Sequence, residues 1–191
     1  MNKPVSIAKS LTQEERDKAV AELESSHQAF LDVTRELSLV QWNFKPGPDR
    51  WSVAECAEHI ALSENFLFRI VTDRVIKTPA ISDERDFSKD DLIAAILQER
   101  SQKATSPEPI DPTKRPTSPQ ASIEQFSASR MRTIEFMKTT SSDLRHHVVV
   151  HPDPKISVLD AYQCILVISG HMRRHILQIL EVRTHPNFPK R

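Results

Sequence analysis

Two histidines, His171 and His175, carry the clearest chemistry in this sequence. They lie four residues apart in the most apolar run of the chain, residues 156–182. In an α-helix this spacing puts two side chains on one face, so both imidazoles can point to one spot. Such a pair can bind a single divalent ion, because Zn–N bonds of about 2.0–2.1 Å require ligands that are near neighbours. Two ligands hold a metal weakly, and a third has to come from elsewhere in the chain.

His59 is the best candidate for that third ligand. It is the only histidine in the second apolar helical segment, one turn after Cys56 and next to Ile60. Taken alone, a histidine at this position is more typical of a packed core edge, and two histidines at helical spacing also arise by chance on surfaces. A zincin-type peptidase is disfavoured, because no glutamate follows His171 as the H-E-x-x-H pattern requires. The residues thus suggest a three-histidine metal site and leave the packing alternative open.

Capping boxes predict where the helices that position these residues begin. In this motif a Ser or Thr, with an acidic or amide residue three positions later, satisfies backbone N–H groups that are otherwise free. Apolar residues at helical spacing then extend each segment. The predicted helices run from Thr12 to about Leu39, from Ser52 to about Lys77, from Ser88 over a shorter stretch, from Pro119 or Ser122 to Lys138, and from Ser157 through the apolar run.

These segments predict an all-α fold, a four-helix bundle with one extra short helix. Leu92 on the short helix and Met131 on the third long helix are expected to face inward. Residues 148–150 are three valines that favour an extended segment, but no convincing partner strand is evident. Bundle interiors suit metal sites, since facing helices can each project a ligand inward.

A proline-rich loop precedes the third long helix. Residues 104–120 contain five prolines, which favour an extended, polyproline-like conformation. A surface excursion is the simpler interpretation. A lid over a site is the alternative, because long loops in compact domains are often functional.

Composition narrows the possible functions. The 191 residues suit one domain, 1–191, and the 26 basic residues balance 26 acidic ones, so no basic patch for nucleic acid is expected. With only two glycines, a Walker or Rossmann glycine motif is nearly excluded. Two cysteines do not make a disulfide scaffold. Without a signal peptide or an apolar run long enough for a membrane span, a cytoplasmic protein with no membrane partner is expected.

Three segments together resemble the DinB-like superfamily: residues 41–46, residues 51–60 with their W-[ST]-x-x-E-x-x-x-H pattern, and residues 171–179 with H-x-x-x-H-x-x-Q. The resemblance extends over nearly the whole chain. It implies a four-helix bundle with a long crossover, a homodimer, and a divalent metal held by His59, His171 and His175. Imidazole suits zinc, nickel, copper and iron alike, and zinc or nickel is the expected metal. Characterised relatives include thiol transferases that use bacillithiol or mycothiol and a mycothiol-dependent maleylpyruvate isomerase, while many others are described as metal-dependent hydrolases.

Three functions are therefore weighed. The leading hypothesis is transfer of a low-molecular-weight thiol to an electrophilic small molecule, because a metal with an open position can deprotonate a bound thiol. The second is hydrolysis by metal-bound hydroxide. For that reaction no general base stands out. Glu55 is expected in a helix cap. Glu58 and Glu64 are candidates, although solvated surface roles are the simpler expectation for both. The third is a metal-binding or stress-related bundle without turnover.

Two further residues are pocket candidates. His27 lies on the inward stripe of the first helix and can hydrogen-bond near a metal, although a core-edge role is the simpler one. Arg174, like Arg173, can attract an anionic thiol or a carboxylate, although solvated flanking arginines are commoner. Cys56 and Cys164 are expected to pack as apolar residues rather than to bind the metal. Three loop histidines, at positions 146, 147 and 151, lie outside the pattern.

Overall fold

The structure is a computed structural model, and it describes residues 11–81, 89–98, 108–112, 118–151 and 156–190. The described α-helices are α1 (Gln13–Thr34), α2 (Leu39–Trp42), α3 (Val53–Asp73), α4 (Lys89–Gln98), α5 (Pro119–Thr139) and α6 (Ala161–Arg183). Two single 3₁₀ turns, η1 (Val75–Lys77) and η2 (Glu108–Ile110), and two short strands, β1 (Val148–Val150) and β2 (Val158–Asp160), complete the described elements.

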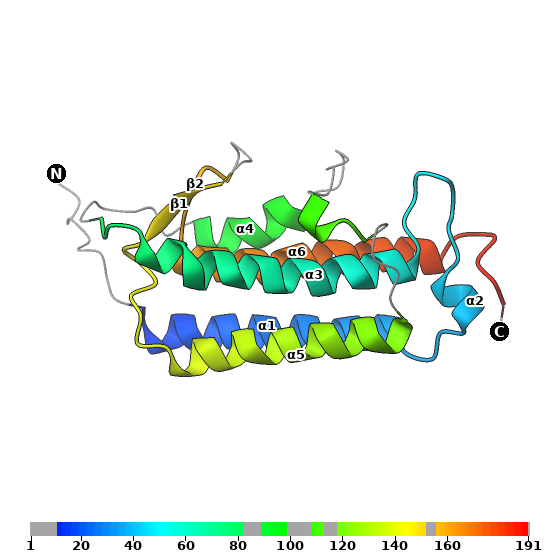
Figure 1. Cartoon of the computed structure of the whole chain (residues 1–191), viewed down its shortest axis with the longest axis horizontal. Helices are drawn as coiled ribbons and strands as arrows, with labels where there is room; N and C mark the ends of the chain where they lie inside the picture. Colours follow the sequence, from blue (N-terminus) through cyan, green and yellow to red (C-terminus); the bar gives the residue numbers. More distant parts are fainter. Residues whose placement is uncertain (1–10, 82–88, 99–107, 113–117, 152–155, 191) are drawn as a thin grey trace.

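The long helices α1, α3, α5 and α6 form the bundle that the sequence predicts. They lie side by side along the long axis of the molecule (Figure 1), and contacts join α1 to α5, α5 to α3, α3 to α6 and α6 to α1. The short helix α4 packs on α6. Figure 1 also shows the β1–β2 pair near one end of the bundle and α2 at the other. No helix of the described residues is both long and apolar enough to cross a membrane.

Residues 158–160 form a strand in the structure, whereas the sequence pattern assigns them to the last helix. Val148–Val150 pairs antiparallel with Val158–Asp160, with Val149 opposite Leu159, so the predicted absence of a strand pair is wrong. Ser157 has φ 63°, a left-handed conformation that does not start a helix. The helix instead begins after Asp160, whose side chain and that of Gln163 form the capping box. The second strand thus uses residues that the sequence pattern had given to the helix.

The first helix is shorter than predicted. It ends at Thr34, and Glu36 follows with φ 59°. Ser38 then starts a new four-residue helix, α2, through a capping box with Gln41. A left-handed residue interrupts the helical hydrogen bonds, so Leu39 belongs to α2 rather than to the first helix.

Two predicted inward positions are exposed. Met131 on α5 is 54% exposed and Leu92 on α4 is 53% exposed. On α4, Ile93 is buried, and the half-buried Ile96 and Leu97 pack against the same apolar cluster. These residues lie three and four positions apart and therefore share one face of α4, and Leu92 lies outside that face. The predicted cap at Ser88 lies outside the described residues.

The core comprises two apolar clusters with charged side chains between the helices. Glu64 of α3 and Arg130 of α5 form a buried ion pair with N–O distances of 2.9 and 2.8 Å, and Thr133 also donates to Glu64. Near the β strands, the buried Arg145 contacts the carboxylates of Glu15, Asp90 and Asp160. The predicted exposure of Glu58 and Glu64 is therefore wrong, because both are buried.

Candidate metal centre

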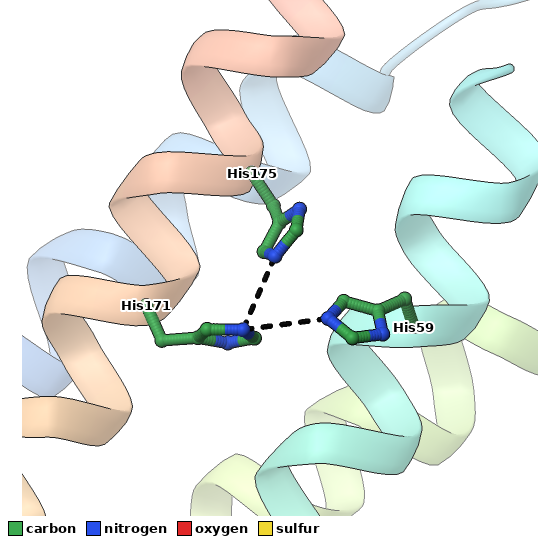
Figure 2. A group of neighbouring side chains, drawn as sticks. All are labelled: His59, His171 and His175. Atoms are coloured by element: carbon green, nitrogen blue, oxygen red, sulfur yellow. Dashed lines mark hydrogen bonds between the residues drawn. The ribbon is translucent and has the colours of Figure 1, made fainter. Parts of the chain in front are cut away.

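The structure brings His59, His171 and His175 together between α3 and α6. Figure 2 shows His59 projecting from α3 towards the two histidines of α6. The Nε2 atom of His171 lies 3.3 Å from Nε2 of His59 and 3.1 Å from Nε2 of His175. His59 and His175 are buried and His171 is half-buried. One potential ligand atom from each residue lies within 4.8 Å of those of the other two.

The two Nε2–Nε2 distances from His171 are those expected for ligands of a single divalent ion. Nitrogens bound at about 2.0–2.1 Å to one ion, with tetrahedral or octahedral angles, lie roughly 2.9–3.4 Å apart. Both measured Nε2–Nε2 distances fall in that range. Three histidine ligands leave at least one coordination position for a molecule that is not part of the protein, as in catalytic rather than structural zinc sites.

Hydrogen bonds to Nδ1 orient two of the three rings. The Nδ1 of His59 lies 2.8 Å from the carbonyl oxygen of Ile110, and the Nδ1 of His175 lies 3.0 Å from Oε1 of Gln178. Both oxygens accept, so in each neutral ring Nδ1 carries the hydrogen and Nε2 keeps its lone pair. Such partners fix the tautomer that a metal requires.

The environment keeps all three rings neutral. Burial is the main cause that lowers the pKa of His171, to about 3, with the nearby His59 and Arg174 adding to it. Burial also lowers the pKa of His59. For His175, burial and the proximity of His171 and His59 hold the pKa well below its usual value. Neutral imidazole is the form that binds metal, so the site does not have to lose protons first.

Trp51 and Ser63 contact the histidine rings, and the sequence pattern did not identify either residue as part of the site. The ring of Trp51 is stacked on that of His175, with centroids 5.8 Å apart and planes 20° apart, and lies 4.9 Å from that of His59. The hydroxyl Oγ of Ser63 is 3.3 Å from Nε2 of His59. Ser63 follows His59 by one helical turn, a spacing that could have drawn attention to it.

The proline-rich segment reaches this site through Ile110. This residue ends η2, is buried, and supplies the carbonyl that receives the hydrogen bond of His59. η2 packs against α3. Sequence reasoning offered no residue of the segment as a partner of a ligand, because a backbone carbonyl leaves no trace in the residue types.

The other candidates fall into two groups. His27 hydrogen-bonds Ser127 at 3.0 Å and packs edge-on against Phe126, so its described contacts join α1 to α5 and do not include the three histidines. Arg174 lies close enough to His171 and His175 to lower their pKa values, and it donates to the carbonyl of Leu97 at the end of α4. Arg174 therefore borders the site.

The two cysteines pack in apolar clusters, and Arg173 forms an ion pair with α1. Cys56 and Cys164 are buried in different apolar clusters, as expected for packing residues. Arg173 pairs with Glu22 of α1 at 2.8 Å.

Two of the three carboxylates considered as general bases, Glu55 and Glu64, have described partners outside the histidine cluster. Glu55 receives hydrogen bonds from the backbone of Ser52 and from Lys45, as predicted for the cap of α3. Glu64 is held by Arg130. Glu58, which precedes His59 in the sequence, is buried.

Comparison with known proteins agrees with this fold. A model of the DinB superfamily matches residues 22–179, and the chain belongs to that superfamily. Among solved structures it is similar to YfiT from Bacillus subtilis, described as a probable metal-dependent hydrolase with an unusual four-helix bundle topology. The TM-score is 0.58 at 19% identity, covering 98% of this chain and 95% of YfiT, a likeness that concerns the fold. No functionally curated protein matches the chain.

Proposed function

We propose that this protein is a metal-dependent enzyme that transfers a low-molecular-weight thiol to an electrophilic small molecule. The observation that carries the proposal is the convergence of three neutral Nε2 atoms at spacings suited to one divalent ion, zinc or nickel. His59, His171 and His175 would hold the ion, and three protein ligands would leave an open position for the thiol. The thiol proton goes to solvent and sulfur forms a bond to carbon. With an alkyl halide, the halide leaves with its electron pair. With an epoxide, the C–O bond breaks and the oxygen takes up a proton from solvent, and with an enone the C=C electron pair shifts towards the carbonyl and the α-carbon takes up the proton.

When bound, the ion would supply Lewis acidity, which favours deprotonation of a thiol at neutral pH. The residues of the chain orient the ligand rings, cover one side of the centre and add positive charge beside it. Ile110 and Gln178 hold two ligand rings in the required tautomer, and the ring of Trp51 covers one side of His59 and His175. Arg174 places positive charge beside the centre, which favours an anionic group on either reactant.

Hydrolysis by metal-bound hydroxide is the second candidate, favoured by the description of YfiT. Two of the three carboxylates considered for proton transfer are already engaged, Glu55 in the cap of α3 and Glu64 with Arg130. Thiol transfer needs no carboxylate to activate its nucleophile, and this difference makes it the preferred proposal.

The test begins with the metal content of the untagged protein, wild type beside His171→Ala. His146→Ala is the matched control, because His146 lies in a loop beside Asp143. About one zinc or nickel per chain is expected in the wild type and the control, and little in His171→Ala, because two remaining ligands chelate weakly.

The loaded protein is then incubated with cysteine or glutathione and a panel of epoxides, alkyl halides and enones, and thiol consumption is followed. The proposal predicts consumption that His171→Ala lacks. Release of product from esters or amides without thiol consumption would support the hydrolase instead. Stoichiometric metal that stabilises the fold, with neither reaction, would indicate a non-catalytic bundle.

A further inference from the structure

Ser63 lies beside the metal-binding face of His59. It is on α3 one turn further along, is 1% exposed, and places its Oγ 3.3 Å from the Nε2 of His59. That nitrogen is the atom His59 would offer to a metal. A buried hydroxyl thus shares its partner with the proposed ion.

The direction of this hydrogen bond follows from the other side of the ring. Nδ1 of His59 donates to the carbonyl of Ile110 at 2.8 Å, so Nε2 of the neutral ring carries no hydrogen. The hydroxyl of Ser63 is therefore the donor and Nε2 the acceptor. Binding of a metal uses the same lone pair and removes this acceptor.

A buried hydroxyl that loses its partner is costly, and Ser63 is too buried for bulk water to replace the lost acceptor. The hydroxyl then needs another acceptor, and two kinds matter for a helical serine beside a metal ligand. One is the carbonyl four residues earlier in its own helix, which serines in helices often use. The other is a non-protein group bound to the metal next to His59.

We propose that Ser63 is a positioning residue that donates a hydrogen bond to the exogenous ligand at the open coordination position beside His59. This inference rests on the metal centre of the proposed function and specifies what that centre accepts. A hydroxyl donor strengthens binding most when its acceptor is charged. Ser63 thereby favours an anionic donor atom, such as a thiolate, over a neutral one, and orients it relative to α3.

The experiment uses the full chain loaded with cobalt, whose visible absorption reports the ligands of a zinc-type site. Azide serves as the anionic probe, and its dissociation constant is measured from the cobalt spectrum for the wild type, Ser63→Ala and Ser63→Thr. Ser169→Ala is the matched control, because Ser169 is also a buried helical serine, and its hydroxyl bonds the carbonyl of Leu166 in its own helix.

All four proteins are expected to bind cobalt equally. Azide should bind Ser63→Ala roughly 10-fold or more weakly, as expected for loss of a hydrogen bond to a charged group. Ser63→Thr keeps the hydroxyl and should restore azide binding, and Ser169→Ala should not change it. A general effect of packing would not separate the threonine variant from the alanine variant in this way.

Three results would overturn the inference. Equal azide affinity in Ser63→Ala and wild type, both loaded with cobalt, would mean that the hydroxyl turns to its own helix. Loss of cobalt from Ser63→Ala alone would make Ser63 part of the metal's coordination rather than a positioning residue. Absence of cobalt from the wild type would refute the metal centre itself, and the proposed function with it.

Discussion

At the scale of single residues, the neighbours of the histidines matter as much as the histidines. Ile110 and Gln178 direct the Nε2 atoms of His59 and His175 inward, and burial keeps the rings neutral. His171 lies between them, within 3.3 Å of both other Nε2 atoms. The same three residue types on a solvated surface would be partly protonated and free to rotate.

The lowered histidine pKa values predict how the stability of the metal-free protein depends on pH. In the unfolded chain these histidines titrate near pH 6.5, whereas the folded protein resists protonation. As the pH falls below about 6.5, the unfolded state takes up more protons and the free energy of unfolding decreases, by up to about 1.4 kcal/mol per pH unit for each proton.

Urea unfolding of chelator-treated protein at about pH 7.5 and about pH 5.5 measures this effect. A variant His171→Asn has one such histidine fewer and should lose less stability between the two pH values. Equal losses in the variant and the wild type would contradict the prediction.

Trp51 should report metal binding by its fluorescence. Its ring lies against those of His59 and His175, so a paramagnetic ion such as nickel at the three Nε2 atoms would lie close enough to quench it. The chain has one other tryptophan, Trp42. Nickel titration should quench Trp42→Phe strongly and Trp51→Phe much less. The opposite order would place the bound nickel elsewhere.

At the scale of the elements, α3 and α6 divide the site between them. α6 supplies two ligands through its own geometry, since positions four apart share a face, whereas α3 supplies His59 and Ser63 in the same way. The start of α3 lies two turns before His59 and is set by the capping box of Ser52 and Glu55. The turn that carries Trp51 leads directly into this cap.

Ser52→Ala should therefore destabilise the protein by about 1 kcal/mol, because it leaves the backbone N–H of Glu55 at the start of α3 without its acceptor. Ser52→Asp supplies an equivalent acceptor and should retain most of the stability. Chemical denaturation monitored by circular dichroism provides both values. An aspartate variant as unstable as the alanine variant would show that the cap hydrogen bond is not what matters.

At the scale of the whole molecule, a buried ion pair helps to join α3 to α5. Arg130 contacts Glu64 with two nitrogens and also donates to the carbonyl of Leu23 and the hydroxyl of Ser26 on α1. Its Nη2 lies 3.2 Å from the sulfur of Met172, next to His171 on α6. Arg130 thus links all four long helices of the bundle.

Removing one partner of this pair should be far more costly than replacing both. Glu64→Gln is expected to lower the free energy of unfolding by about 3–5 kcal/mol, because Arg130 is left as a buried uncompensated charge. The double variant Glu64→Leu with Arg130→Met removes both charges and should recover a large part of that loss. Thermal and urea unfolding of the three proteins test this, and a double variant less stable than Glu64→Gln would contradict it.

Two expectations about the whole molecule stay predictions. One is a single domain over residues 1–191, and the other is the homodimer that the family resemblance implies. Sedimentation of the metal-loaded chain measures the second directly.

The sequence by itself determined the four long helices, the capping boxes of α1 and α3, and the three histidines as one candidate set. These depend on local spacing and on residue type, which the chain carries without reference to its fold. The strand pair, the true start of α6 and the exposed sides of Met131 and Leu92 depended on contacts between distant segments.

The same distinction applies to the site. The His171–His175 pair follows from one helical turn, but its distance from His59, the carbonyl of Ile110 and the hydroxyl of Ser63 was decided only by the packing of α3, α6 and η2. A backbone oxygen has no identity in the sequence, and a serine is a common residue. Only the tertiary structure, which buries these groups against the ligand ring, gives them a part in the chemistry.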